Sequence, residues 1–140
     1  MTHHHLHSSP ETCHWGFFEA ALEPVLTVKS GDEVTVDTIS GGPDMVPDRD
    51  KFHIPPEMHE VHARNERMLP GHILTGPIAV EGAEPGDVLA VEILDVQLRQ
   101  DWGWNMIKPL SGTLPDDFHE TRILNIPLDR SRMVGRMPWG

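Results

Sequence analysis

The chain has 140 residues, of which 38% are hydrophobic, and its formal net charge is −11 with histidine neutral. This length suits one domain with a hydrophobic core, and the negative charge argues against a nucleic-acid backbone or an anionic membrane surface as partner. No stretch approaches the roughly 20 apolar residues of a membrane-spanning helix. The single cysteine, Cys13, cannot form an internal disulfide, and the N-terminus lacks the apolar stretch of a signal peptide. We therefore expect a cytoplasmic protein.

The N-terminal residues 1–10 are polar and predict a flexible segment, since chain termini are commonly loose. In an extended conformation, His3, His5 and His7 would project to one side of this segment. Such a row could bind a divalent metal, although a solvated terminus is the simpler interpretation.

Residues 24–40 predict a β-hairpin, in which residues 25–28 and 33–39 form the strands and Ser30-Gly31-Asp32 form the turn. Residues 55–68 predict a helix, because Pro56 suits its first turn and Met58 and Val61 share one face at helical spacing.

A second hairpin is predicted from a strand at 78–80, a turn at 82–87 and a strand at 88–98, with a β-bulge at 93–94 where the alternation changes phase. Residues 101–117 are rich in Trp, Gly and Pro and predict irregular structure, and residues 123–128 predict a further strand. This order of elements fits a mainly β fold, an antiparallel β-sandwich or barrel with one or two short helices.

Several side chains are candidates for chemistry. His14 lies beside Trp15 near two phenylalanines, which suits a pocket wall or, equally, a buried histidine with a satisfied hydrogen bond. His72 and Thr75 stand where a loop enters a strand, where they could orient a small polar substrate or serve turn chemistry. A Cys13–His14 dyad is disfavoured, because adjacent residues of a strand point to opposite faces.

Two further patterns carry less information. His59 and His62 are spaced i, i+3 instead of the i, i+4 of a metalloprotease helix, so two solvated histidines are the better interpretation. Five aspartates could each act as a ligand or a base, and the sequence prefers none of them: Asp37, Asp44, Asp87, Asp95 and Asp101.

The run Gly-His-Ile-Leu-Thr-Gly-Pro-Ile-Ala-Val-Glu-Gly-Ala-Glu-Pro-Gly-Asp-Val-Leu at residues 71–89 resembles a hallmark of the acetamidase/formamidase family. Thr-Cys-His-Trp-Gly at 12–16, Asp-Trp-Gly-Trp-Asn at 101–105 and residues 112–118 resemble further family segments in the same order. The resemblance implies a jelly-roll-like β-sandwich in a cytoplasmic homo-oligomer. The implied activity is metal-dependent hydrolysis of short amides such as formamide and acetamide to the carboxylic acid and ammonia.

The resemblance also implies roles for particular residues. We expect His14 and His72 to be catalytic and Trp15 and Thr75 to contact substrate. Residues 11–140 correspond to an N-terminal β-domain whose second half is absent, so we expect the chain alone to be inactive. A divalent metal, zinc or calcium, would then be held mostly by ligands outside this chain. The alternative is a non-enzymatic β-domain that binds a metal or a small ligand.

Overall fold

A computed structural model describes all 140 residues, which form nine strands, one α-helix and one 3-10 helix. The predicted mainly β fold is confirmed. The chain divides into two compact units, residues 1–43 with 56–92 and residues 44–55 with 93–140. The β-domain over residues 11–140 stays a prediction. None of the helices has the length and apolar character needed to cross a lipid bilayer.

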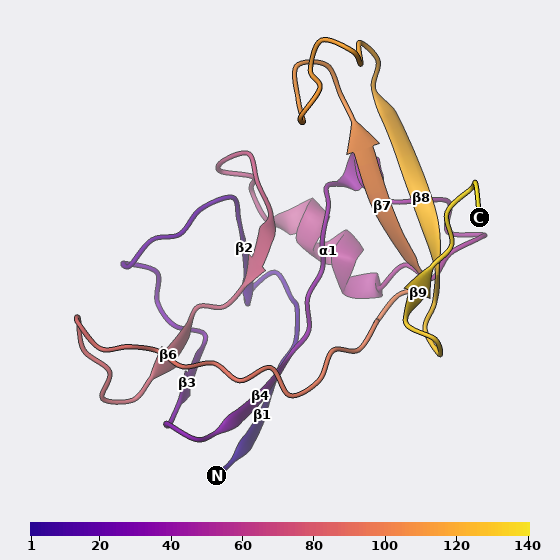
Figure 1. Ribbon diagram of the computed structural model, residues 1–140. Coiled ribbons are helices and arrows are strands. Elements are labelled where there is room, and N and C mark those ends of the chain that lie inside the picture. The colour runs from indigo at the N-terminus through magenta and orange to yellow at the C-terminus, as the bar shows by residue number, and fades with distance from the viewer. The chain divides into compact units, whose positions relative to one another are not determined.

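The first unit contains three two-stranded sheets (Figure 1). β1 (His3–Leu6) runs parallel to β4 (Glu33–Val36), β2 (Cys13–Trp15) runs antiparallel to β5 (Ile73–Thr75), and β3 (Leu26–Val28) runs parallel to β6 (Ile78–Val80). Two of the three pairs are therefore parallel, where the sequence predicts antiparallel neighbours. Each pair joins segments far apart in the chain, and a jelly-roll sandwich remains a prediction.

The predicted hairpin at 24–40 is correct in its turn and wrong in its pairing. The Asp32 N–H donates to the Lys29 carbonyl at 3.0 Å, which closes the turn. β3 and β4 on either side of it do not pair with each other. Their backbone groups bond instead to β6 and β1, because a strand can satisfy its hydrogen bonds with any extended neighbour that packing brings close.

The N-terminal residues contribute to this arrangement. The sequence predicts a flexible segment over residues 1–10, and the structure places β1 within it. Leu6 and Ser8 are each 5% exposed, whereas His3, His5 and His7 are exposed. The alternation therefore puts these three histidines on one side of the strand, as predicted.

The helix α1 (Pro56–Arg64) lies inside the predicted range 55–68 and ends four residues early. Its Met58 and Val61 are completely buried. They share the core of the first unit with apolar side chains from the strands and the segment after β4: Leu6, Cys13, Trp15, Val28, Ile39 and Ile73.

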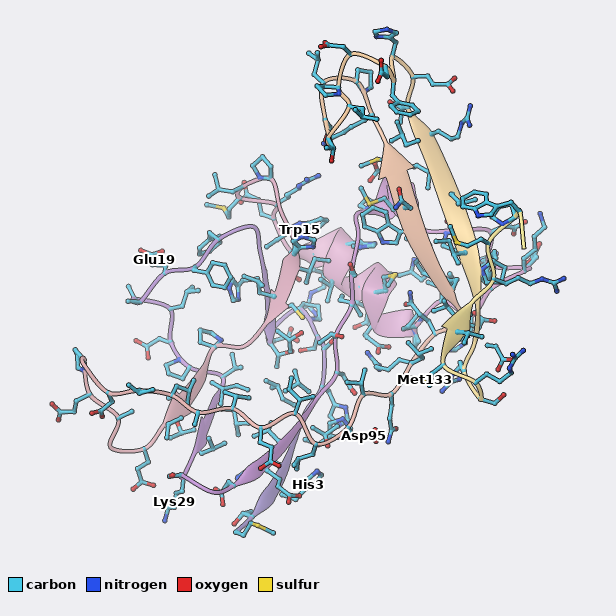
Figure 2. All side chains as sticks on the ribbon, viewed as in Figure 1. His3, Trp15, Glu19, Lys29, Asp95 and Met133 are labelled. Carbon is cyan, nitrogen blue, oxygen red and sulfur yellow. The ribbon has the colours of Figure 1, made fainter.

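The predicted strand at 88–98 is wrong, since this segment pairs with no other, and the predicted bulge at 93–94 has no ladder to interrupt. Its apolar side chains are exposed, with Val88 at 93% and Ile93 at 76%. Figure 2 shows Asp95 on this extended stretch. The apolar side chains therefore alternate as in a strand, but no other segment pairs with this stretch.

The second unit is an antiparallel sheet in the order β7 (Trp102–Ile107), β8 (Arg122–Asp129) and β9 (Val134–Gly135) (Figure 1). β8 confirms the predicted strand at 123–128, whereas β7 corrects the predicted irregular structure at 101–117. Trp102 is 1% exposed and its indole N–H donates to the His53 carbonyl at 2.9 Å. The remaining helical element is the 3-10 helix η1 (Pro43–Met45).

Candidate functional site

His14 is positioned by the antiparallel pair of β2 and β5, where it stands opposite Leu74. Its neighbours Cys13 and Trp15 point into the core, whereas His14 is half-buried on the other face of the strand. Its ring lies 5.4 Å from that of Phe17, centroid to centroid. This geometry rules out a direct Cys13–His14 dyad, as the sequence predicts.

An open hollow of about 410 Å³ lies beside His14. Its walls are mainly apolar with a smaller polar part, and the lining includes His14, Phe18, Glu19, Leu22, Leu74 and Thr75. Small-molecule sites commonly combine apolar walls with a few polar groups in this way. Sequence reasoning found His14 and Thr75 but missed Glu19, which comes from the loop after β2 (Figure 2).

The Thr75 hydroxyl connects the hollow to the end of β4. It donates to the backbone carbonyl of Asp37 at 3.1 Å and lies 3.6 Å from the Cys13 sulfur. A hydroxyl has one proton and two lone pairs. With its proton directed to Asp37, the hydroxyl can accept from the Cys13 thiol, which stands opposite it on the buried face of the β2–β5 pair.

Trp15 occupies a different environment. It is 5% exposed, and its indole N–H donates to the Gly71 carbonyl at 3.1 Å. Its ring centroid lies 5.7 Å from that of His62 and 5.4 Å from the Arg67 guanidinium carbon. Trp15 is not among the residues that line the hollow, and these contacts hold β2 against the segment that leads into β5.

His72 is exposed and precedes β5. Its backbone carbonyl accepts a hydrogen bond from the Gly16 N–H at 3.1 Å, and its side chain is not part of the hollow. The structure thus brings His14 and Thr75 together at one cavity and leaves His72 and Trp15 outside it.

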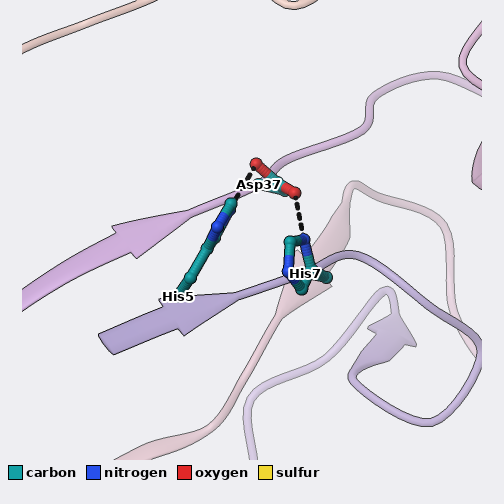
Figure 3. Close-up of side chains that lie close together, drawn as sticks. All are labelled: His5, His7 and Asp37. Carbon is teal, nitrogen blue, oxygen red and sulfur yellow. Dashed lines mark hydrogen bonds and ion pairs between the residues drawn. The ribbon is translucent and has the colours of Figure 1, made fainter. Parts of the chain in front are cut away.

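A second group of polar side chains lies where β1 and β4 end (Figure 3). It consists of His5, His7 and Asp37, which we call the His–Asp cluster. The Asp37 carboxylate lies 3.1 Å from Nε2 of His5 through one oxygen and 2.9 Å from Nδ1 of His7 through the other. The two imidazole rings are 3.8 Å apart, centroid to centroid.

The donor atoms of the His–Asp cluster fit the ligands of a divalent metal. One atom from each residue lies within 4.8 Å of the other two, and a tetrahedral zinc site holds its donors about 3.4 Å apart. Two imidazole nitrogens and one carboxylate match zinc and its neighbours, whereas calcium and magnesium prefer oxygen ligands.

The sequence indicated two parts of this cluster without joining them. The alternation places His5 and His7 on one side, and the sequence prefers none of five aspartates, of which Asp37 is one. The register of β1 on β4 pairs His5 with Thr35 and Leu6 with Val36, so His7 follows level with Asp37. Only the parallel pairing could have singled out this aspartate.

Residues 2–128 match the model of the acetamidase/formamidase family. A formamidase of Methylophilus methylotrophus is 35% identical over 104 residues, which cover 71% of this chain and 24% of that enzyme. An acetamidase of Mycolicibacterium smegmatis is 61% identical over 33 residues, which cover 24% of this chain and 8% of that enzyme.

The chain therefore spans at most about a quarter of the length of these curated relatives. No solved structure matches it. Because the family model covers most of its residues, the chain belongs to the acetamidase/formamidase family.

Proposed function

We propose that this chain is part of an amide hydrolase that converts short linear amides, such as formamide and acetamide, to the carboxylic acid and ammonia. The observation that carries the proposal is the family match over residues 2–128, together with similarity to enzymes named formamidase and acetamidase. The hollow beside His14 supports it, because its mainly apolar walls suit a short alkyl group and its few polar groups suit an amide.

Amide hydrolysis requires a polarised carbonyl, an activated water and a proton for the leaving amine. His14 is the group of the hollow best suited to carry that proton, since an imidazole can both accept and donate one near neutral pH. Thr75 also lines the hollow and remains the candidate for a substrate contact there. His72 remains a candidate for a second catalytic group and Trp15 for a substrate contact, although both lie outside the hollow.

A divalent metal bound to the complete enzyme would polarise the carbonyl and lower the pKa of a bound water towards about 7. The residues of this chain would then position the amide beside that water and move protons. The sequence leads us to expect most metal ligands outside this chain.

We further propose that the chain alone is inactive and that catalysis requires the part of the protein corresponding to the remainder of its relatives. The 24% coverage of the Methylophilus enzyme supports this. A cytoplasmic homo-oligomer is the assembly that we expect for the complete enzyme.

The second candidate function is a β-domain that binds a metal without hydrolysing anything. The His–Asp cluster favours it, since its three donors converge within this chain. The two functions are separated by catalysis and not by metal binding, because a binding domain could hold zinc equally well.

The test is ammonia release from formamide, acetamide and propionamide, with and without zinc. The assay compares this chain with a version extended along the reading frame beyond Gly140, and the Methylophilus formamidase serves as positive control. Activity in the extended version alone supports a partial enzyme, and activity in both would place the chemistry on residues described above. Silence from both, beside an active control, would favour the binding domain.

In whichever version is active, His14→Ala is expected to lower kcat at least about 100-fold, the usual contribution of a general acid or base. His59→Ala is the matched control, because it removes an exposed imidazole from α1, away from the residues that line the hollow. Equal turnover in the two variants would exclude His14 from catalysis.

A further inference from the structure

We infer that the His–Asp cluster is a binding site for a divalent transition metal of the zinc class, with His5, His7 and Asp37 as its protein ligands. This inference rests on the metal-binding part of the proposed function, and it replaces the expectation that most ligands lie outside this chain with three ligands inside it. Its test is binding, so it does not depend on hydrolysis by this chain.

The strand register delivers the three ligands to one place. His5 and His7 are two residues apart on β1, so they share a face, and β4 runs beside them in parallel and ends one residue before Asp37. The carboxylate already lies between the two rings, with one oxygen 3.1 Å from His5 and the other 2.9 Å from His7 (Figure 3). A cation would take the place of the protons that these contacts now share.

The backbone of Asp37 is fixed by three neighbours. Its N–H donates to the Leu6 carbonyl at 2.9 Å. Its carbonyl accepts from the hydroxyls of Ser8 at 2.7 Å and Thr75 at 3.1 Å. Outer hydrogen bonds of this kind hold a metal ligand in place before the metal arrives.

The exposure of the side chains leaves room for an ion and a further ligand. The Asp37 side chain is 15% exposed, whereas those of His5 and His7 are 42% and 69% exposed. The carboxylate therefore lies on the more buried side of the site, and the two imidazoles lie on its solvent-exposed side. Three protein ligands with an open fourth position are typical of catalytic zinc, whereas structural zinc is enclosed by four.

Thr75 links this site to the hollow beside His14. Its backbone belongs to β5, its hydroxyl is bonded to the Asp37 carbonyl, and it lines the cavity. A metal that fixes Asp37 would therefore also restrain Thr75, one of the residues that line the hollow. This connection gives a metal at the His–Asp cluster a route to influence the hollow.

The main competing explanation is unspecific chelation by the histidine-rich N-terminus. His3 and His4 would contribute to such chelation as much as His5 and His7, and Asp37 would not. In the structure His3 bonds to Thr35 and His4 to Asp32, so neither is directed at the cluster. Substitutions of His3 and His4 on one side and of His7 and Asp37 on the other can therefore distinguish a folded metal site from unspecific chelation by the N-terminus.

The experiment is calorimetric titration of the chain with zinc, repeated with cobalt while the visible ligand-field absorption is recorded. We expect one zinc per chain. Asp37→Asn and His7→Gln should each weaken binding by more than about 10-fold and change the cobalt spectrum, because each removes a ligand. The double variant His3→Ala/His4→Ala is the matched control and should bind as the parent does. Far-UV circular dichroism checks that every variant keeps its fold.

Loss of affinity in the His3/His4 variant with no change in Asp37→Asn would overturn the proposal in favour of unspecific chelation, and so would the absence of binding. The amidase proposal is judged separately. Zinc binding at the His–Asp cluster without ammonia release from any version would support the metal site and contradict the catalytic function. Ammonia release without zinc binding at the cluster would support the catalytic function and contradict the metal site.

Discussion

At the residue scale, Gly16 fixes how the two segments around the hollow approach each other. It follows Trp15 with φ +95°, and a Cβ at this position would lie 2.2 Å from the Leu69 carbonyl oxygen. Its N–H also donates to the His72 carbonyl. A side chain here would push β2 away from the segment that enters β5, and those two strands carry His14 and Thr75.

Gly16→Ala is therefore expected to destabilise the chain by about 2 to 5 kcal/mol, from the left-handed backbone and the clash together. Gly31→Ala is the matched control, because Gly31 also has a positive φ, +86°, but no atom lies within 4 Å of its added Cβ. It should cost only about 1 to 2 kcal/mol. Urea unfolding measures both losses, and equal losses would show that the close approach to Leu69 has no energetic importance.

Asp32 joins the turn before β4 to the start of β1. Its carboxylate accepts from the backbone N–H groups of Thr2 at 2.7 Å and Lys29 at 3.0 Å. These two hydrogen bonds, and then the His4 imidazole, lower the pKa of Asp32 from its ordinary value of 3.8 to about 2. The charged form is therefore the one that stabilises the folded chain.

Because the pKa is lower in the folded chain, this stabilisation is complete above the ordinary pKa of 3.8 and is lost as pH falls towards 2. Asp32→Asn, which has no charge to lose, should show a smaller decline over that interval. The measurement is the urea midpoint of both proteins across the acid range. Parallel curves would contradict the role assigned to Asp32, whatever the other carboxylates contribute.

At the element scale, the sequence predicted what local chemistry decides. The positions of Pro56, Met58 and Val61 predict the helix, and the Gly-Asp pair predicts the turn at Asp32. The sequence does not predict how the strands pair. Nothing in residues 26–36 states that β3 prefers β6 and β4 prefers β1, since such choices depend on contacts between distant segments.

The candidate site divides in the same way. His14 and Thr75 were singled out by their neighbours in the chain and by family resemblance, and the structure places both at one hollow. Glu19 and the role of Asp37 depend on how the chain folds back on itself. β7 was missed because tryptophan and glycine at 102–104 suggested a loop, whereas Trp102 is buried in a strand.

At the scale of the whole molecule, the exposed surface is larger than that of compact domains of the same total mass. The chain exposes 10412 Å². Two separate compact units of the same total mass would together expose about 8800 Å². The excess of about 1600 Å² is about twice the roughly 800 Å² that one partner buries in a standard protein–protein interface.

The segment at 88–98 is a large contributor to this excess, since it exposes a series of apolar side chains with no partner strand: Val88, Leu89, Val91, Ile93, Leu94 and Val96. Exposed alternating segments with unpaired backbone groups readily pair with another chain. We therefore expect the chain to self-associate in a concentration-dependent manner, which sedimentation velocity would measure.

The double variant Leu94→Ser/Val96→Ser should weaken this association by at least about 10-fold, because each apolar side chain buried in an interface contributes about 1.5 to 3 kcal/mol. Leu110→Ser/Leu114→Ser is the matched control, since it removes two leucines that are 87% and 56% exposed outside this segment. If association weakens equally in both variants, general hydrophobicity drives it and the segment is not a specific strand donor. A parent chain that stays monomeric at every concentration would contradict self-association through the segment at 88–98. The next partner to test for this segment would be the remainder of a full-length relative.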